Sequence, residues 1–445
     1  MAEDSGEVLP RHGLEELDLP ATPAGRQARW YLAHLAEHGA RLTVEEIAEH
    51  MACGPQWSPE QQLEAFLRDD GRPYEFGRVL ATSADEIGVV FDYGDDRPFR
   101  LTLFVEPGRP HRIVRTWWAR DLPDDIVIRQ AEATDSAALN DLEVRAPMTL
   151  GEDTTVVYDR GTDFLAFSRL MDENVCFVAE RAGELLGIAC GAAHHVRIGG
   201  QQHRVMLLHH LRVPVVHRKL GVFSTLNGYV FGFYEGRTDG AYGYTALDNA
   251  EAMRINGPGT WETGVFRCVV PTTGAVASGV GRAATEEDSD RVIDVLNRCH
   301  ADEEVFLPYS SDSWRSRLAR APELYSWREV RVGEGAVLGV WAAGLRVSVQ
   351  QSGASAPSKA VRAVALDHGF LPGHEGAFMA LLDDVRAELA ARGHTELTFV
   401  LSEASPAFPL VAPIATRKEP FAFRMAIPEP DGTVARGVYV DTVYF

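Results

Sequence analysis

Apolar residues along this chain recur in patterns that predict strands and helices in turn from about residue 126 onward. Helical spacing follows Thr134-Asp135-Ser136 and returns after Gly221. Two short turns, at 181–184 and at Gly199-Gly200, separate apolar runs that are long enough to pair as hairpins. The runs that we expect to form strands are 126–129, 176–180, 185–189, 205–213 and 242–247. This order predicts a mixed α/β domain whose sheet carries helices on its faces.

The same pattern occurs twice along the chain. The matched positions are Arg129 and Arg282, Asp135 and Asp288, Leu186 and Leu338, and Gly221 and Gly376. Their separation stays between 152 and 155 residues, a register that similar composition alone does not keep. The sequence therefore predicts two domains of one fold in tandem, at about 123–272 and 280–445.

The first 122 residues belong to neither copy and predict a small α+β domain. Thr22-Pro23 begins a helix, and Thr43 and Ser58 each begin a capping box. Alternating runs at 88–93, 99–105 and 112–118 then predict a meander of strands. This segment carries no recognisable catalytic set, so packing, partner binding and substrate gating all stay open as its role.

Composition limits the partners. The 445 residues carry a formal net charge of −21, which argues against nucleic acid and anionic membranes, since both are bound through Lys and Arg. Five cysteines lie far apart and mostly in apolar runs, a usage typical of reduced thiols in a cytoplasmic protein. We expect neither a secretion signal nor a membrane span. The oligomeric state is left open.

Histidines are dense between residues 194 and 210, which raises the question of a metal site. A hairpin that turns at Gly199-Gly200 places His194 opposite Met206 and His209 opposite Gly191. These side chains then do not converge, and we expect no metal ion.

The strongest candidate for chemistry is the corner Arg218-Lys219-Leu220-Gly221-Val222-Phe223. It joins a strand-like run to a helical pattern that places Phe223, Leu226, Val230 and Phe233 on one face. The first N–H groups of a helix attract anions, and Gly221 lets a phosphate approach the backbone. A local basic patch adds charge through Arg212, His217, Arg218 and Lys219. This corner predicts a diphosphate site.

Val213, four intervening residues and Arg218-x-x-Gly221 resemble the acyl-CoA loop of GNAT acyltransferases, and the element order over 126–270 resembles that family too. The resemblance implies acetyl-CoA or another acyl-CoA as co-substrate in the central domain. The coenzyme-contacting residues that it implies are Leu211, Val213, Arg218, Lys219, Leu220, Gly221, Val222, Phe223, Ser224 and Asn249. Phe223 stands where the family has a small residue, a departure that holds the helix further from the phosphates.

The second copy has lost these features. Arg218 and Asn249 correspond to Gly373 and Ala404, and Glu375 places a carboxylate where phosphates would lie. We expect this domain to be a structural or acceptor-site partner.

The N-terminal segment resembles the small N-terminal domain of clavam-cluster serine hydrolases, which is like a fragment of the cone-shaped isomerase fold. The motifs that carry this resemblance are 25–30 (Gly-Arg-Gln-Ala-Arg-Trp) and 100–103 (Arg-Leu-Thr-Leu).

Amine acylation needs a base, an oxyanion donor and an acid for the leaving thiolate. The resemblance implies a donor N–H near Leu211–Val213, and a base on the strand face that holds His209. Strict alternation places His210 on the opposite face. Two roles for His209 stay open: it acts as the catalytic base, or it only shapes the pocket. Asn256 stands where the family has its tyrosine acid, so Tyr244 or water is the alternative.

The chain ends in a strand-like run, 439–445, for which we expect an edge strand. A terminal carboxylate serves as base in one multidomain relative. The carboxylate of Phe445 and the side chain of Asp248 are therefore two alternative bases.

The resulting hypothesis is an acyl-CoA-dependent N-acyltransferase that acts on a small-molecule amine in natural-product biosynthesis or resistance. One alternative replaces the donor with a carrier protein or an aminoacyl-tRNA. Another is a ligand-binding or sequestering protein that keeps the cleft without catalysis. Tight coenzyme binding without acyl transfer would distinguish the sequestering protein from the N-acyltransferase.

Overall fold

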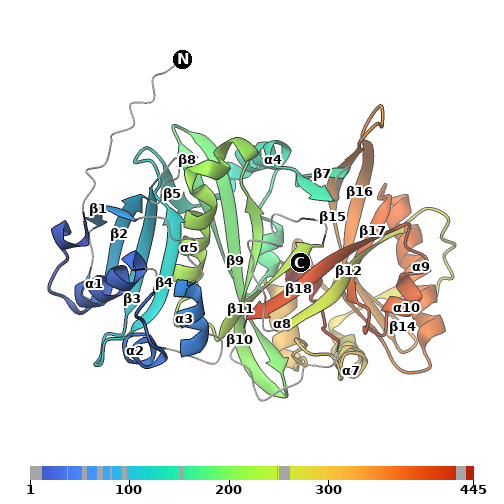
Figure 1. The fold of residues 1–445 in the computed structure, drawn as a ribbon. Helices are drawn as coiled ribbons and strands as arrows, with labels where there is room; N and C mark the ends of the chain where they lie inside the picture. The colour runs from blue at the N-terminus through green and yellow to red at the C-terminus, as the bar shows by residue number, and fades with distance from the viewer. Residues whose placement is uncertain are drawn as a thin grey trace. The chain divides into compact units, whose positions relative to one another are not determined.

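The computed structural model describes residues 13–37, 39–52, 58–67, 74–80, 83–92, 98–150, 154–247, 249, 261–426 and 437–444 (Figure 1). The chain divides into two compact units. One comprises Met1–Val127 with Val215–Tyr229, and the other comprises Ile128–Pro214 with Val230–Phe445. Helix α5, Val222–Tyr234, therefore contributes residues to both units.

The first unit combines helices with an antiparallel meander in the order β1-β2-β3-β4. Its elements are α1 (Pro23–Ala36), α2 (Val44–His50), α3 (Pro59–Leu67), β1 (Glu75–Leu80), β2 (Glu86–Asp92), β3 (Phe99–Val105) and β4 (Ile113–Arg120). The Thr22 hydroxyl accepts a hydrogen bond from the Gly25 N–H, and Thr43 forms the expected capping box with Glu46. One apolar core joins the helices to the sheet. The α+β expectation is confirmed, and β1 is an addition to it.

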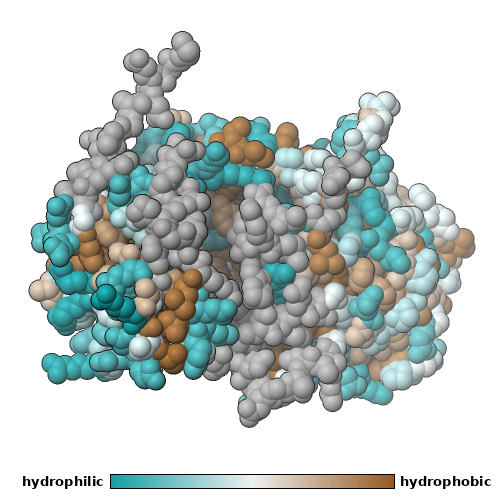
Figure 2. Space-filling model, viewed as in Figure 1, coloured by the Kyte–Doolittle hydropathy of each residue, from teal (hydrophilic) through white to brown (hydrophobic). Residues whose placement is uncertain are grey.

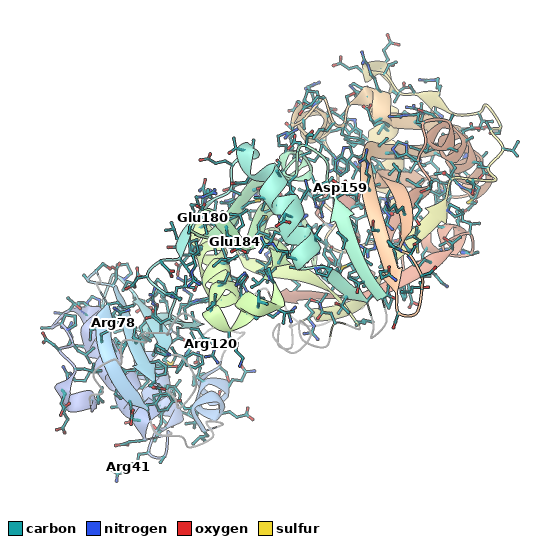
Figure 3. All side chains as sticks on the ribbon, turned by 90° about the horizontal axis from the view of Figure 1, so that it is seen from above. Arg41, Arg78, Arg120, Asp159, Glu180 and Glu184 are labelled. Atoms are coloured by element: carbon teal, nitrogen blue, oxygen red, sulfur yellow. The ribbon has the colours of Figure 1, made fainter. Side chains whose placement is uncertain are left out.

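The second unit begins with the elements expected of the first repeat. They are β5 (Val127–Gln130), α4 (Ser136–Arg145), β8 (Glu173–Arg181), β9 (Glu184–Ile198), β10 (Gln201–Arg212) and β11 (Gly240–Ala246). Gly199 and Gly200 make the turn between β9 and β10 with φ of 55° and 80°, a region that favours glycine. Glu180 and Glu184 flank the β8–β9 turn in Figure 3. The sequence did not indicate β6 (Met148–Leu150) or β7 (Thr154–Asp159).

The second repeat rebuilds this arrangement. Its elements are β13 (Arg282–Ala283), α7 (Ser289–Cys299), α8 (Ser311–Ala319), β14 (Val330–Gly333), β15 (Ala336–Gln351), β16 (Ser358–Phe370), α9 (Glu375–Ala391), β17 (Glu396–Ser402) and α10 (Phe408–Val411). Arg129 binds both carboxylate oxygens of Asp135 at 2.8 Å, and Arg282 binds those of Asp288 at 2.7 and 2.5 Å. The repeated sequence motif is thus a repeated ion pair.

The two halves share one sheet by exchanging their last strands. Strand β12 (Trp261–Pro271) ends the first half and pairs with β17 of the second. Strand β18 (Arg417–Ala426) ends the second half and pairs with β11 of the first. The exchanged strands also pair with each other, and Figure 1 shows them side by side between β11 and β17. The halves are therefore joined through continuous backbone hydrogen bonding.

The chain's last described segment lies in the core of this unit. Val438, Val440 and Val443 are at most 2% exposed, and Val438 bridges to Glu304. The expectation of a plain edge strand over 439–445 is wrong, because the segment is covered and ends in the short helix Thr442–Tyr444.

Among the described residues, no helix is long and apolar enough to cross a membrane. Figure 2 shows hydrophilic and hydrophobic residues interspersed on the visible face of the second repeat.

Candidate functional site

Strands β10 and β11 separate part-way along their length. They pair in parallel over Val205–Leu207 alone, after which β11 continues against β18 as far as Ala246. The β10 residues beyond Leu207 therefore do not share backbone hydrogen bonds with β11. Leu211, one of the expected coenzyme contacts, lies in this splayed part, where its backbone is not paired with β11. Val213, another expected contact, follows the end of β10 at Arg212.

A bulge interrupts β10 within the same stretch. Pairing with β9 runs from His209 opposite Cys190 directly to Arg212 opposite Ile188, and His210 has φ of 49°. The bulge brings the two histidines together, with Nδ1 of His209 2.7 Å from Nδ1 of His210. The expectation that they point to opposite faces is wrong, because strict alternation holds only in a regular strand.

Both histidines are neutral at ordinary pH. Burial, and then the positive charge of Arg160, lower the pKa of His209 to about 3. The same causes, in the same order, hold the pKa of His210 well below its ordinary value. Nε2 of His209 is buried and has no hydrogen-bond partner among the described residues. When Nδ1 of His209 donates to His210, that Nε2 carries the lone pair and can accept a proton.

The histidine-rich hairpin turns as expected, with partners within one residue of those predicted. His194 lies opposite Val205, next to Met206, and His209 lies opposite Cys190, next to Gly191. Over the part of the chain that the structure describes, no group of three or more His, Cys, Asp or Glu residues could hold a metal ion.

The expected diphosphate corner forms a short helix followed by α5. A 3₁₀ helix spans Val215–Leu220, Gly221 turns the chain, and α5 begins at Val222. Arg218 and Lys219 are exposed, and the Ser224 hydroxyl donates to the Gly221 carbonyl at 3.0 Å. The first N–H groups of α5 therefore stand beside two exposed cations, which is the composition of an anion site.

Gly221 has a structural reason to be glycine. Its φ is 82°, and a Cβ at this position would lie 2.7 Å from both Cβ and the carbonyl oxygen of Arg120, at the end of β4. Figure 3 labels Arg120. Packing against the end of β4 therefore requires glycine here, independently of any phosphate.

Helix α5 buries two of the four positions expected on its apolar face, Leu226 and Val230, and is rotated slightly from that face. Val222, Leu226, Val230 and Tyr234 are at most 2% exposed, whereas Phe223 and Phe233 are half-buried. Phe223 thus stays near the loop surface, where the acyl-CoA resemblance places a small residue.

Arg212 does not belong to the basic patch that the sequence indicated. Its Nε donates to Oε2 of Glu143 on α4, at 3.3 Å, and Glu143 is 1% exposed. The charge of Arg212 is therefore taken up inside the unit.

The remaining expected residues lie at or after the end of β11. Tyr244 belongs to β11, and burial followed by the nearby carboxylate of Asp441 holds its pKa well above the ordinary value, so the phenol keeps its proton. The Asn249 N–H donates to the Ala246 carbonyl at 3.0 Å. Asn256, Asp248 and Phe445 lie outside the described residues.

Sequence reasoning missed a buried polar cluster near Tyr244. Arg317 donates to both carboxylate oxygens of Asp441, at 2.8 and 3.0 Å, and to Asp367 at 3.1 Å. Asp367 also accepts from the Tyr325 hydroxyl at 2.6 Å. These residues come from separate parts of the sequence, so no local motif announces them.

In the loop of the second repeat that corresponds to the Arg218–Gly221 corner, a glutamate side chain accepts a backbone hydrogen bond. Oε1 of Glu375 accepts a hydrogen bond from the Gly373 N–H at 3.2 Å, at the start of α9. A carboxylate therefore takes the place that an anionic ligand would need.

No family model matches the chain, and no curated protein sequence matches it. The structure is similar to that of Saccharomyces cerevisiae N-myristoyltransferase with bound myristoyl-CoA, with a TM-score of 0.51 and 10% identity over 72% of this chain and 91% of that one. A structure of the same enzyme with myristoyl-CoA and inhibitors gives 0.52 and 9% identity, over 72% and 88%. A GCN5-related N-acetyltransferase from Sphaerobacter thermophilus aligns with a TM-score of 0.44 and 13% identity, over 72% and 100%. The chain therefore shares the fold of N-myristoyltransferase, and its sheet is built from two mixed halves in tandem.

Proposed function

We propose that the protein is an acyl-CoA-dependent N-acyltransferase, with acetyl-CoA as the donor and a small-molecule amine as the acceptor. The observation that carries this proposal is the splay of β10 from β11 after Leu207, directly before the Arg218–Gly221 corner in the sequence. A splayed strand leaves backbone N–H groups for a thioester, and a basic corner at a helix start suits a diphosphate. The fold shared with N-myristoyltransferase supports the same class of donor.

The proposed chemistry uses groups in the second unit. The acceptor nitrogen attacks the thioester carbon, and the N–H of Leu211 or Val213 donates to the carbonyl oxygen as it gains charge. Nε2 of His209 takes the proton that the nitrogen loses. The C–S bond then breaks, and the thiolate receives a proton from Tyr244 or from water.

The pKa shifts fix the resting protonation states of His209 and Tyr244, and they make His209 a weak base and Tyr244 a weak acid. The lowered pKa of His209 leaves its imidazole neutral, and the raised pKa of Tyr244 leaves its phenol protonated. A neutral imidazole can accept a proton and a phenol can donate one. Asn256 takes no part in this proposal as an acid, since an amide has no proton to give at neutral pH.

We assign the coenzyme to the central domain, 123–272, and none to the domain at 280–445. The residues proposed to contact the coenzyme are Leu211, Val213, Arg218, Lys219, Leu220, Gly221, Val222, Phe223, Ser224 and Asn249. The carboxylate of Glu375 on the Gly373 N–H supports this one-sided assignment. The segment 1–122, which carries the resemblance to a hydrolase accessory domain, is proposed to act on acceptor access.

A thioester-release assay tests the proposal. Purified protein is mixed with acetyl-CoA and a panel of amines drawn from natural products, and free thiol is measured. Amine-dependent release with mass-confirmed acylation is the expected result. Binding of acetyl-CoA by calorimetry without release for any amine supports the sequestering alternative, which the bulky Phe223 in the loop favours. Absence of coenzyme binding contradicts both.

A further inference from the structure

A buried carboxylate occupies a core position of α4. Leu139, Leu142 and Glu143 on this helix are each at most 1% exposed. The corresponding helix of the second repeat, α7, carries Leu296 at the position of Glu143, 153 residues later and also 1% exposed. The fold therefore accepts leucine here, and burying a charge instead is costly. Something other than packing accounts for Glu143.

Glu143 stands between two arginines. Arg212 Nε donates to its Oε2 at 3.3 Å, whereas Arg160 Nε lies 3.8 Å from its Oε1, too far for a hydrogen bond. Neither Arg160 Nε nor Glu143 Oε1 has a hydrogen-bond partner among the described residues. One carboxylate thus faces two guanidinium groups, and the cluster keeps one positive charge in excess.

The guanidinium group of Arg160 packs against two aromatic rings. Arg160 follows β7, next to Asp159, which Figure 3 labels. Its guanidinium carbon lies 5.3 Å from the ring centre of Phe164 and 5.6 Å from that of Tyr158. The side chain is 14% exposed, against 22% for Arg212 and 1% for Glu143, so both arginines keep accessible surface, but Arg212 alone donates a hydrogen bond to the carboxylate. A planar guanidinium set between aromatic rings is well ordered to receive an oxyanion.

The excess charge lies beside the proposed base. The Phe164 ring that contacts Arg160 also contacts His210, with ring centres 6.1 Å apart. The charge of Arg160 also contributes to the lowered pKa of both His209 and His210. One aromatic ring, Phe164, thus contacts both Arg160 and the histidine pair.

We propose that Arg160 binds an oxyanion on the acceptor, so that the substrate is an amine that also carries a carboxylate or a phosphate. This inference rests on the proposed acyl transfer. A purely structural Arg160 is disfavoured, because Arg212 already supplies Glu143 with a hydrogen-bonded partner.

Matched pairs of amines test the inference. L-Lysine is compared with L-lysinamide, and glucosamine 6-phosphate with glucosamine, in the thioester-release assay. The wild-type protein should favour the anionic member of a pair by at least about tenfold in kcat/KM, the scale of one charge-assisted contact. Preference in the first pair alone assigns a carboxylate, and in the second alone a phosphate.

Two variants identify the residue. Arg160→Gln should bring the ratio within a pair close to one, mainly through KM, while Arg160→Lys keeps part of the preference. Arg346→Gln is the control, because Arg346 is 75% exposed and also lies near Asp159, at 3.8 Å. If Arg160→Gln does not fold, the ratios of Arg160→Lys and the wild type decide the question.

Three outcomes would overturn the inference: equal rates within both pairs for the wild type, a preference that survives in Arg160→Gln, or acetyl-CoA binding with turnover of neutral amines alone. Calorimetry separates the two proposals. Failure of wild-type protein to bind acetyl-CoA contradicts the acyl transfer itself, whereas normal binding with no anion preference contradicts the role of Arg160.

Discussion

Nδ1 of His209 lies 2.7 Å from Nδ1 of His210, so two consecutive residues of one strand share a hydrogen bond. The bulge in β10 makes this contact possible, with His210 at φ of 49°. One ring must donate and the other accept, so each histidine fixes the tautomer of its neighbour. The two rings are therefore coupled, and a change at either one alters the tautomer of the other.

Replacing either histidine should lower activity. We predict that His209→Ala reduces kcat by ~10²-fold or more, the usual scale for losing a general base. His210→Ala should give a smaller loss, because it frees the tautomer of His209 without removing the base. Steady-state kinetics on both variants, beside thermal melts to confirm folding, measures this. Wild-type kcat in His209→Ala would rule out its role.

The pH dependence of the reaction follows from the same pair. Because the pKa of His209 is lowered to about 3, protonation of this base begins far below neutral pH. We predict no loss of kcat/KM from His209 between about pH 7 and pH 5, where an unperturbed histidine of pKa about 6.5 would titrate. An acidic limb near pH 6.5 that disappears in His209→Ala would contradict the burial of this site.

Buried neutral histidines should make the fold sensitive to acid. Burial lowers the pKa of His368 to about 3 and that of His194 to about 4. The unfolded chain takes up these protons below about pH 6.5 while the native chain does not, so stability falls as pH drops. His368→Leu should lower that slope by up to about 1.4 kcal/mol per pH unit between about pH 6 and pH 4.

Urea unfolding at a series of pH values measures this slope. His195→Gln is the control, since His195 is exposed on the same strand as His194. An unchanged slope in His368→Leu would mean that His368 is protonated in the native protein.

Gly221 should tolerate alanine poorly. An added Cβ would meet the Arg120 backbone and would also have to adopt a positive φ. We predict that Gly221→Ala lowers the free energy of unfolding by ~1–3 kcal/mol and weakens coenzyme binding as the corner shifts. Gly236→Ala is the matched control, because its φ is 67° but a Cβ there meets nothing within 4 Å. Equal effects of the two changes would remove the role of the Arg120 contact.

The fold could be predicted largely from local signals. Apolar runs and turns located β5, β8, β9, β10 and β11, and the repeat of Arg129 with Asp135 marked the second half. These features need only neighbouring residues or a constant offset. The exchange of β12 and β18 between halves could not be predicted this way, because either strand would satisfy the pattern within its own half.

The site was harder to predict for the same reason. The corner at Arg218 and the choice of His209 came from a motif and a strand position. Period-two alternation has no means to indicate the bulge at His210. Glu143 did give a signal, a charged residue next to Leu142 on the buried face of a helix, which apolar periodicity alone passes over. Arg160 carried no sequence signal, because its partners lie on α4 and β10.

One acyl-CoA should bind per chain, at the Arg218–Gly221 corner of the central domain. Titration calorimetry with acetyl-CoA tests it most directly, using wild-type protein, Arg218→Glu and the exposed control Arg41→Glu, which changes net charge equally. We predict a stoichiometry of one, a Kd at least about tenfold weaker in Arg218→Glu, and no change in Arg41→Glu. Two coenzymes per chain, or unaltered affinity in Arg218→Glu, would contradict the account.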